Sequence, residues 1–248
     1  MSGSQGLRRF VTSTSEAAPA NAAGRTDPGV AEADMAIASL AVAGIALPDV
    51  SASPGQPSDT EKCELCATEV PETHSHIADL EHSSLLCACR ACYLLFTQPE
   101  AGRGRYRSVP DRYVTDPAHP VSAGEWESLE IPVGLAFFMR DSRQGEVTGF
   151  YPSPAGATQC ELDLGAWDEL VTGHPLLAAM TPDVEAVLIT RSEAGVENYI
   201  VPIDACYELA GRMRLLWRGF DGGEEARASI AQFLDHVRGR ARDLDREA

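Results

Sequence analysis

The pattern of apolar positions between residues 126 and 242 predicts short strands joined by hairpin turns. Continuous runs of apolar and β-branched residues are typical of buried strands, and polar or glycine-containing segments between them indicate turns. The expected strands are Ile131–Met139, Val147–Tyr151, Val184–Thr190 and Asn198–Val201, with turns at Asp141–Glu146 and Ala194–Gly195 and a loop at Pro152–Gly156. Hairpins of this kind predict an antiparallel sheet.

Helical spacing of apolar residues appears between and after these strands, and each expected helix has a start signal. The starts are Asp163, Pro175, Asp204 and the pair Asp221 and Glu224, which has capping-box spacing. The apolar stripes are Ala166, Trp167, Leu170 and Val171 in the first helix, Cys206, Leu209, Ala210, Met213, Leu216 and Trp217 in the third, and Ala226, Ile230, Phe233, Leu234 and Val237 in the last. We therefore expect residues 126–242 to form an α+β domain in which an antiparallel sheet packs with helices.

The apolar pattern fades in residues 1–58, which are rich in Ala, Ser, Gly and Pro. Such a segment buries too little apolar surface to offset its ordering entropy, so we expect a mostly disordered N-terminal segment. Two islands interrupt it, the basic and aromatic Leu7–Phe10 and an Ala-rich stretch, Val30–Leu47, that could form a short helix.

The charge and composition of the chain disfavour some classes of function. The net charge of −17 disfavours a general nucleic-acid or anionic-membrane binder. Met1–Phe10 carries no apolar run of a targeting signal, and Met35–Pro48 is too short to span a bilayer. A cytoplasmic protein is expected, and clustered thiols in that compartment are more often metal ligands or redox groups than disulfides.

Five of the seven cysteines lie between positions 63 and 92, within a predicted metal-binding module at residues 59–98. Two Cys-x-x-Cys pairs point four sulfurs into one tetrahedral site, although the 22-residue gap between the pairs slightly exceeds the usual zinc-ribbon spacing. The expected zinc ligands are Cys63, Cys66, Cys89 and Cys92. The apolar run Tyr93–Phe96 fits either a helix that starts at the second pair, as in treble-clef modules, or a short buried strand, as in zinc ribbons.

Three other residues in the module could replace one of these ligands, namely Cys87, His74 and His76. We expect Cys87 to be a spare residue that packs as a small hydrophobe, because Cys-x-Cys closes a less regular loop. The two histidines, with His82, are expected to be exposed loop residues. The isolated Cys160 and Cys206 are expected in the core.

Iron is the alternative metal, since a rubredoxin-type site uses the same two pairs. The residue after each pair is usually glycine there and is here Ala67 or Tyr93, which lowers the weight of this alternative. An iron–sulfur cluster on Cys87, Cys89 and Cys92 ranks third. Four thiolates form a closed site, which is structural by default, whereas catalytic zinc keeps one position open.

Residues 99–125 form a connector between module and domain. Arg103, Arg105, Arg107 and Arg112 alternate there with Tyr106 and Tyr113, a combination that can hold phosphates and stacked bases. We favour a solvated loop whose arginines pair with the many nearby acids, and we keep a nucleic-acid-binding zinc ribbon as the lesser alternative.

The chain resembles an uncharacterised bacterial family over residues 61 to about 240 and the short island at Leu7–Phe10. The matching segments are Cys63–Cys66, Leu86–Cys92 with Leu95–Phe96, Arg105–Arg107, Val109–Arg112, Ile131–Phe138, Phe150–Thr158 and Val201–Tyr207. The family is labelled a domain of unknown function, and its genes resemble accessory genes in clusters for nickel–iron hydrogenases. The resemblance implies a helper role in hydrogenase assembly or electron handling.

No Walker A loop, dinucleotide-binding glycine motif or Gly-x-Ser-x-Gly elbow occurs in the sequence. We therefore expect a non-enzymatic, zinc-binding accessory protein whose partner is a hydrogenase subunit or maturation factor. The alternatives are a rubredoxin-like iron electron carrier and, after it, a nucleic-acid-binding zinc ribbon.

Overall fold

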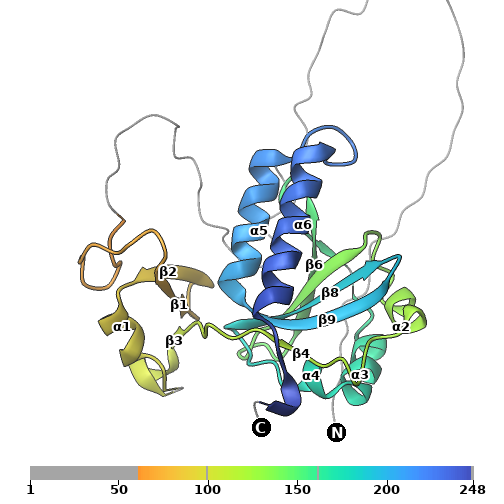
Figure 1. The fold of residues 1–248 in the computed structure, drawn as a ribbon. Coiled ribbons are helices and arrows are strands. Elements are labelled where there is room, and N and C mark those ends of the chain that lie inside the picture. Colours follow the sequence, from red (N-terminus) through yellow and green to blue (C-terminus); the bar gives the residue numbers. More distant parts are fainter. Residues whose placement is uncertain (1–60, 99, 161, 247–248) are drawn as a thin grey trace, which may run out of the picture. The chain divides into compact units, whose positions relative to one another are not determined.

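The computed structural model describes residues 61–246 apart from positions 99 and 161. Within this part the chain is a mixed α+β structure with antiparallel sheets and helices, which confirms the predicted fold class (Figure 1). The expected disordered segment 1–58, with Leu7–Phe10 and the Val30–Leu47 helix, lies outside the described residues.

The larger sheet has seven strands in the order β10-β4-β9-β8-β5-β6-β7. Every neighbouring pair is antiparallel except β10 and β4, which are parallel. The strands are β4 (Val114–Thr115), β5 (Leu135–Arg140), β6 (Val147–Ser153), β7 (Gly156–Cys160), β8 (Glu185–Ser192), β9 (Gly195–Pro202) and β10 (Arg242–Asp243). The four predicted strands β5, β6, β8 and β9 form its centre, so the hairpin pattern was read correctly.

Several predicted boundaries in this sheet differ from the observed ones, and two of the differences change the description of the fold. The first strand begins at Leu135 and not at Ile131, since Leu135 is the first residue of β5 that pairs with β8. The segment Pro152–Gly156 is not a loop but the tight turn of the β6–β7 hairpin, in which Ser153 pairs with Gly156. Gly156 has a φ of 97°, a conformation that glycine adopts without strain, and this permits the tight connection.

Helices cover both faces of the larger sheet (Figure 1). Successive side chains of β5 point to opposite faces, so Phe137 packs against α5 and α6 while Phe138 packs with Trp167 of α3. The helices are α2 (Ala123–Ser128), α3 (Leu164–Gly173) and α4 (Pro175–Ala178) on one face, and α5 (Ile203–Leu216) and α6 (Gly223–Arg240) on the other, with a 3₁₀ turn at Leu244–Arg246 after β10. None of the helices in the described part is long and apolar enough to span a lipid bilayer.

One of three predicted side-chain caps is confirmed. The Asp163 carboxylate accepts a hydrogen bond of 3.0 Å from the Ala166 amide at the start of α3. Asp204 does not cap α5, which starts after Pro202, because its carboxylate contacts His76 instead. Asp221 and Glu224 form no capping box either, since α6 starts after Gly222 and the Asp221 carboxylate pairs with Arg227.

The cysteine module is built on a second sheet of three strands in the order β2-β1-β3. Strand β1 (Ser75–Asp79) pairs with β2 (Ser84–Ala88) and with β3 (Tyr106–Ser108), both antiparallel. Helix α1 (Arg90–Leu95) follows β2, and a 3₁₀ turn at Ala101–Gly104 precedes β3. Strands β3 and β4 and the start of α2 all come from the segment 99–125 that was expected to be a connector.

The two faces of the β1–β2 hairpin have different neighbours. Ile77 and Ala88 pack with Cys63 and Cys92 in the core of the module. Ala78, on the opposite face, packs with Val109 of the module and with Val184 and Ile203 of the α+β domain, and Leu85 lies against the same group. The hairpin is therefore the layer between the cysteine cluster and the rest of the fold.

Candidate metal centre

The first cysteine pair lies in a tight turn of the backbone. The Ala67 amide donates to the Cys63 carbonyl over 2.7 Å, and the Cys63 amide donates to the Thr68 carbonyl over 2.8 Å. Ala67 closes the turn with a φ of 59°, in the left-handed region. These bonds curl the chain around both sulfurs, with Cys63 buried and Cys66 exposed.

The second pair sits at the start of a helix. Cys89 is the N-cap residue of α1, and its sulfur accepts a hydrogen bond of 3.5 Å from the Cys92 amide one turn later. Of the two structures left open for Tyr93–Phe96, the helix is correct over Arg90–Leu95. A cysteine turn, a β-hairpin and a helix in this order form a treble-clef-like module, in which one ligand pair comes from the turn and the other from the helix start.

The four sulfurs of Cys63, Cys66, Cys89 and Cys92 lie within 4.8 Å of one another, and Cys66 Sγ is 3.6 Å from Cys89 Sγ. Zinc–sulfur bonds of about 2.3 Å in a tetrahedron place neighbouring sulfurs about 3.8 Å apart. The observed spacing fits such a metal, so the four predicted cysteines lie close together and could hold one.

The surroundings shift the pKa values of two of these thiols in opposite directions. The hydroxyl and amide of Thr68, and then the thiols of Cys63 and Cys89, lower the pKa of Cys66 to about 6. Burial, and then the neighbouring thiols, raise the pKa of Cys92 to about 12. Without a metal the group therefore holds thiolate and thiol side by side, whereas a bound cation would deprotonate all four sulfurs.

Three of the four arginines of segment 99–125 pair with acids. Arg105 makes a two-bond contact with Asp79, at 3.2 and 2.7 Å, and Arg107 and Arg112 pair with Asp183 and Glu185. Burial works to raise the pKa of Asp79, but the bonds from Arg105 and His82 outweigh it and hold that pKa well below its usual range. The predicted pairing of some arginines with acids is confirmed, but the expected solvated loop is wrong, because the segment forms β3 and β4.

Sequence comparison places the chain in one family. The chain belongs to the family of unknown function DUF5947. Its family profile matches residues 62–241, which include the whole cysteine cluster and nearly all of the α+β domain. Neither a curated protein nor a solved structure matched the chain.

The three possible substitute ligands of this family member lie together elsewhere in the module. His74, His76 and Cys87 form a separate group whose ligand atoms are within 4.8 Å of one another. The β1–β2 register sets His76 directly opposite Cys87, and sequence reasoning missed this pairing because it considered each residue only as a substitute. Cys160 is half-buried and Cys206 is fully buried in α5, outside both groups.

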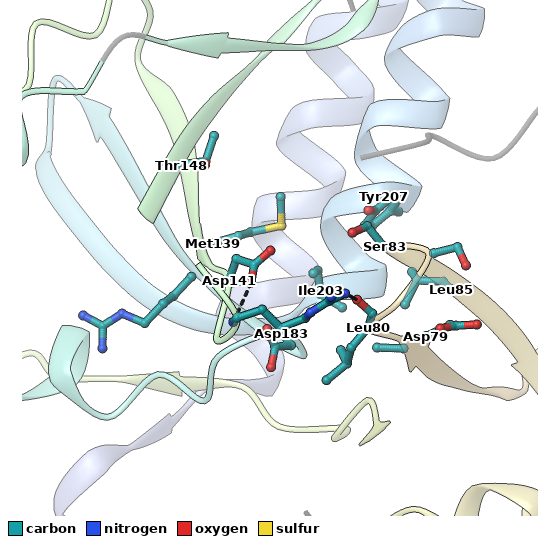
Figure 2. Close-up of a pocket in the computed structure, with 14 residues that line it drawn as sticks. Asp79, Leu80, Ser83, Leu85, Met139, Asp141, Thr148, Asp183, Ile203 and Tyr207 are labelled. Atoms are coloured by element: carbon teal, nitrogen blue, oxygen red, sulfur yellow. Dashed lines mark hydrogen bonds between the residues drawn. The ribbon is translucent and has the colours of Figure 1, made fainter. Parts of the chain in front are cut away.

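A cavity of about 90 Å³ lies where the tip of the β1–β2 hairpin meets β5, β6 and the start of α5 (Figure 2). Leu85, Met139 and Ile203 supply apolar lining. Two charged groups at its edge have partners, since Arg143 donates to the Leu80 carbonyl over 2.8 Å and Asp183 accepts from Arg107, whereas Arg140 Nε is buried without a hydrogen-bond partner among the described residues. The volume suits a few water molecules, and we assign it no chemistry.

Proposed function

We propose that this chain is a zinc-binding, non-enzymatic accessory protein of the cytoplasm that acts through protein contacts in the assembly or function of a nickel–iron hydrogenase. The observation that supports a metal-dependent but non-catalytic role is the closure of the Cys63, Cys66, Cys89 and Cys92 group by four thiols. Zinc bound by four thiolates has no position left for a substrate, so it organises the fold around it.

The surroundings of the group support a structural role. Cys63 and Cys92 belong to the buried core of the module with Val70, Ile77 and Ala88. A core this small gives a short module little stability of its own, and a bound metal adds its binding free energy directly to folding. The metal would thereby fix the surface that the module presents to a partner.

Zinc is favoured over rubredoxin-type iron by the second cysteine pair. Tyr93 follows that pair within helix α1, so the second pair does not repeat the backbone turn of the first. The two metals differ visibly, since an iron tetrathiolate is red and a zinc tetrathiolate is colourless.

The partner class rests on the sequence resemblance to a family encoded beside nickel–iron hydrogenase genes. Two leucines of α1 support contacts with another protein, because Leu94 and Leu95 leave 52% and 65% of their surface exposed. Exposed apolar side chains beside a rigid metal site are suited to binding a protein surface.

Metal analysis tests the first half of this proposal. Full-length protein purified under reducing conditions without added metal should contain zinc and no iron. Cys→Ser changes at 63, 66, 89 and 92 should each abolish the four-thiolate site, as read by the sulfur-to-metal charge-transfer bands of the cobalt-substituted protein. Cys87→Ser should keep those bands, and their loss in that variant with retention in Cys89→Ser would overturn the ligand assignment.

Affinity capture tests the second half. The tagged full-length chain, expressed in cells with an intact nickel–iron hydrogenase operon, should retain a hydrogenase subunit or maturation factor. Leu95→Ser should weaken this capture and leave the metal content unchanged, whereas Leu164→Ser, at an exposed leucine of α3, should not. Capture of no hydrogenase component by the wild-type chain would contradict the proposed role.

A further inference from the structure

A second set of metal-ligating side chains lies on the opposite face of the β1–β2 hairpin from the buried core of the cysteine module. His76 is directly opposite Cys87 in the antiparallel register, and His74 is two residues before His76, on the same side of the chain. The ligand atoms of these three side chains lie within 4.8 Å of one another. The group shares no residue with the four-cysteine cluster.

Within the described residues, the hydrogen bonds of the two histidines use the same ring nitrogen, Nδ1. His74 Nδ1 is 2.9 Å from the Pro71 carbonyl, and His76 Nδ1 is 2.8 Å from the Asp204 carboxylate. A carbonyl and a carboxylate accept hydrogen bonds, so Nδ1 donates in both rings and Nε2 carries the lone pair. Metal-binding histidines are held in this way, with the second nitrogen donating to a carboxylate or a backbone carbonyl.

The free nitrogen of His74 is an unexplained buried polar atom. The His74 side chain is only 7% exposed, and its Nε2 is buried without a hydrogen-bond partner among the described residues. Burying an unpaired acceptor is costly, whereas a metal would use that lone pair. The two imidazole rings lie with their centroids 4.9 Å apart, close enough to share one ion.

Charge around the group favours a cation. Glu61 lies 3.5 Å from His74 Nδ1, and the Glu64 carboxylate accepts a hydrogen bond of 2.6 Å from the Cys87 amide. Asp204 adds a third carboxylate behind His76. A divalent ion would offset this concentration of negative charge, which otherwise repels itself.

From these contacts we infer that His74, His76 and Cys87 form a second metal site, distinct from the four-cysteine site, for a zinc-like divalent cation. Two imidazoles and one thiolate are ligands of borderline softness that suit zinc, and their ligand atoms already lie within 4.8 Å of one another. Three protein ligands leave the fourth position open to water or a small ligand, unlike the closed site. This inference does not depend on the accessory role.

Cobalt titration of the reduced full-length chain tests the second site. Wild-type protein should bind two equivalents, one with the intense bands of four thiolates and one with the weaker band of a single thiolate. Cys87→Ser and His76→Ala should each bind one equivalent with unchanged four-thiolate bands. The matched controls Cys160→Ser and His119→Ala, which lie outside both groups, should bind two.

Asp204→Asn provides an independent readout that removes no ligand. Loss of a carboxylate behind a metal-bound histidine weakens metal binding 10–100-fold. The dissociation constant of the second cobalt equivalent should rise by about this factor, and that of the four-thiolate equivalent should not change. A wild-type stoichiometry of one, two equivalents in Cys87→Ser, or an unchanged second constant in Asp204→Asn would overturn the second site, while leaving the four-cysteine site in place.

Discussion

At the scale of single residues, Ala67 holds a backbone conformation that costs energy for any residue with a β-carbon. Its φ of 59° lies in the left-handed region, where an L-residue loses about 1–2 kcal/mol relative to its preferred conformations. The turn needs this conformation, because the Ala67 amide must reach the Cys63 carbonyl. Glycine is the residue usually expected at this point of a cysteine turn, and the strain shows why.

Ala67→Gly should therefore stabilise the metal-loaded protein. Relief of about 1–2 kcal/mol of strain, less about 0.4–1 kcal/mol for the greater freedom of glycine in the unfolded chain, leaves a gain of about 0.5–1 kcal/mol. Urea denaturation of the zinc-loaded chain measures it. Ala91→Gly, on the exposed side of helix α1, should instead lose about 1 kcal/mol, and two changes of the same sign would contradict the strain at Ala67.

The sequence predicted the four-cysteine group, but it did not predict that His74 and His76 would lie together with Cys87. Cysteine spacing alone predicted which sulfurs come together, since both ligands of each pair are neighbours in sequence. Asp204 was read as a helix cap because only its local sequence was visible, whereas its partner His76 is 128 residues away. The orientation of each imidazole, and so the free Nε2 of His74, depends on such distant or irregular contacts.

At the scale of elements, the start of helix α2 is secured by a capping box that also binds a distant histidine. Ser122 accepts from the Glu125 amide, and the Glu125 carboxylate accepts from the Ser122 amide over 2.7 Å. The same carboxylate lies 3.0 Å from Nε2 of buried His174, the residue between α3 and α4. Glu125 thus ties three helices of one layer together.

The charge of Glu125 should make stability depend on pH. Its bonds to the Ser122 hydroxyl and amide, and then to His174, lower its pKa from 4.5 to about 2. Because the folded-state pKa is the lower one, the stabilisation is fully present above pH 4.5 and is lost as the pH falls toward 2. The Glu125 side chain is 42% exposed, so solvent screening reduces the effect to about 1 kcal/mol.

Glu125→Gln tests this because glutamine keeps the capping box but not the charge. Its stability deficit against wild type, measured by urea denaturation, should be about 1 kcal/mol at pH 7 and should be clearly smaller at pH 3. Glu127→Gln, on the same helix and paired with exposed Arg191, should show little change at either pH. A deficit for Glu125→Gln that is the same at both pH values would rule out the charge as its cause.

The elements that sequence predicted are those with strong local patterns. The strands β5, β6, β8 and β9 have long apolar runs, while the strands that were missed are short, such as β4 and β10 with two residues each. Strand β7 was missed because its sequence, Gly156–Cys160, is small and polar and gains strand geometry only by pairing with β6. Such segments become strands because they pair with another strand, and the local sequence of one segment carries no information about that pairing.

At the scale of the whole described molecule, the cysteine module and the α+β domain share a hydrophobic cluster. Ala78 and Val109 of the module are buried with Val184 and Ile203 of the domain, and Arg107 donates to the Pro182 carbonyl over 3.0 Å across the same contact. Because these groups bury each other, loss of the module should expose apolar surface of the domain. Metal binding in the module should therefore stabilise both parts.

Tryptophan fluorescence can measure this coupling, because all three tryptophans, Trp126, Trp167 and Trp217, belong to the α+β domain. A metal held at a concentration about 1,000 times its dissociation constant adds about 4 kcal/mol to stability, which is about 8–16 °C in melting temperature at this chain length. Chelation should lower the melting temperature seen by the tryptophans by about this amount. If chelation leaves the melting temperature seen by the tryptophans unchanged, the domain folds independently of the module.

Ala78→Glu should separate the two parts, since it places a charge in the shared cluster where Ala78 is only 5% exposed. The unfolding transition seen by the tryptophans of this variant should lie at a lower temperature. Chelation should shift it much less, because the domain and the module no longer stabilise each other through the shared cluster. Ala91→Glu, the same change at an exposed position of α1, should keep the full response of the wild type. If chelation shifts the melting temperature of both variants equally, the shared cluster does not couple the module to the domain. The coupling would then be assigned to the ion pairs of Arg107 and Arg112.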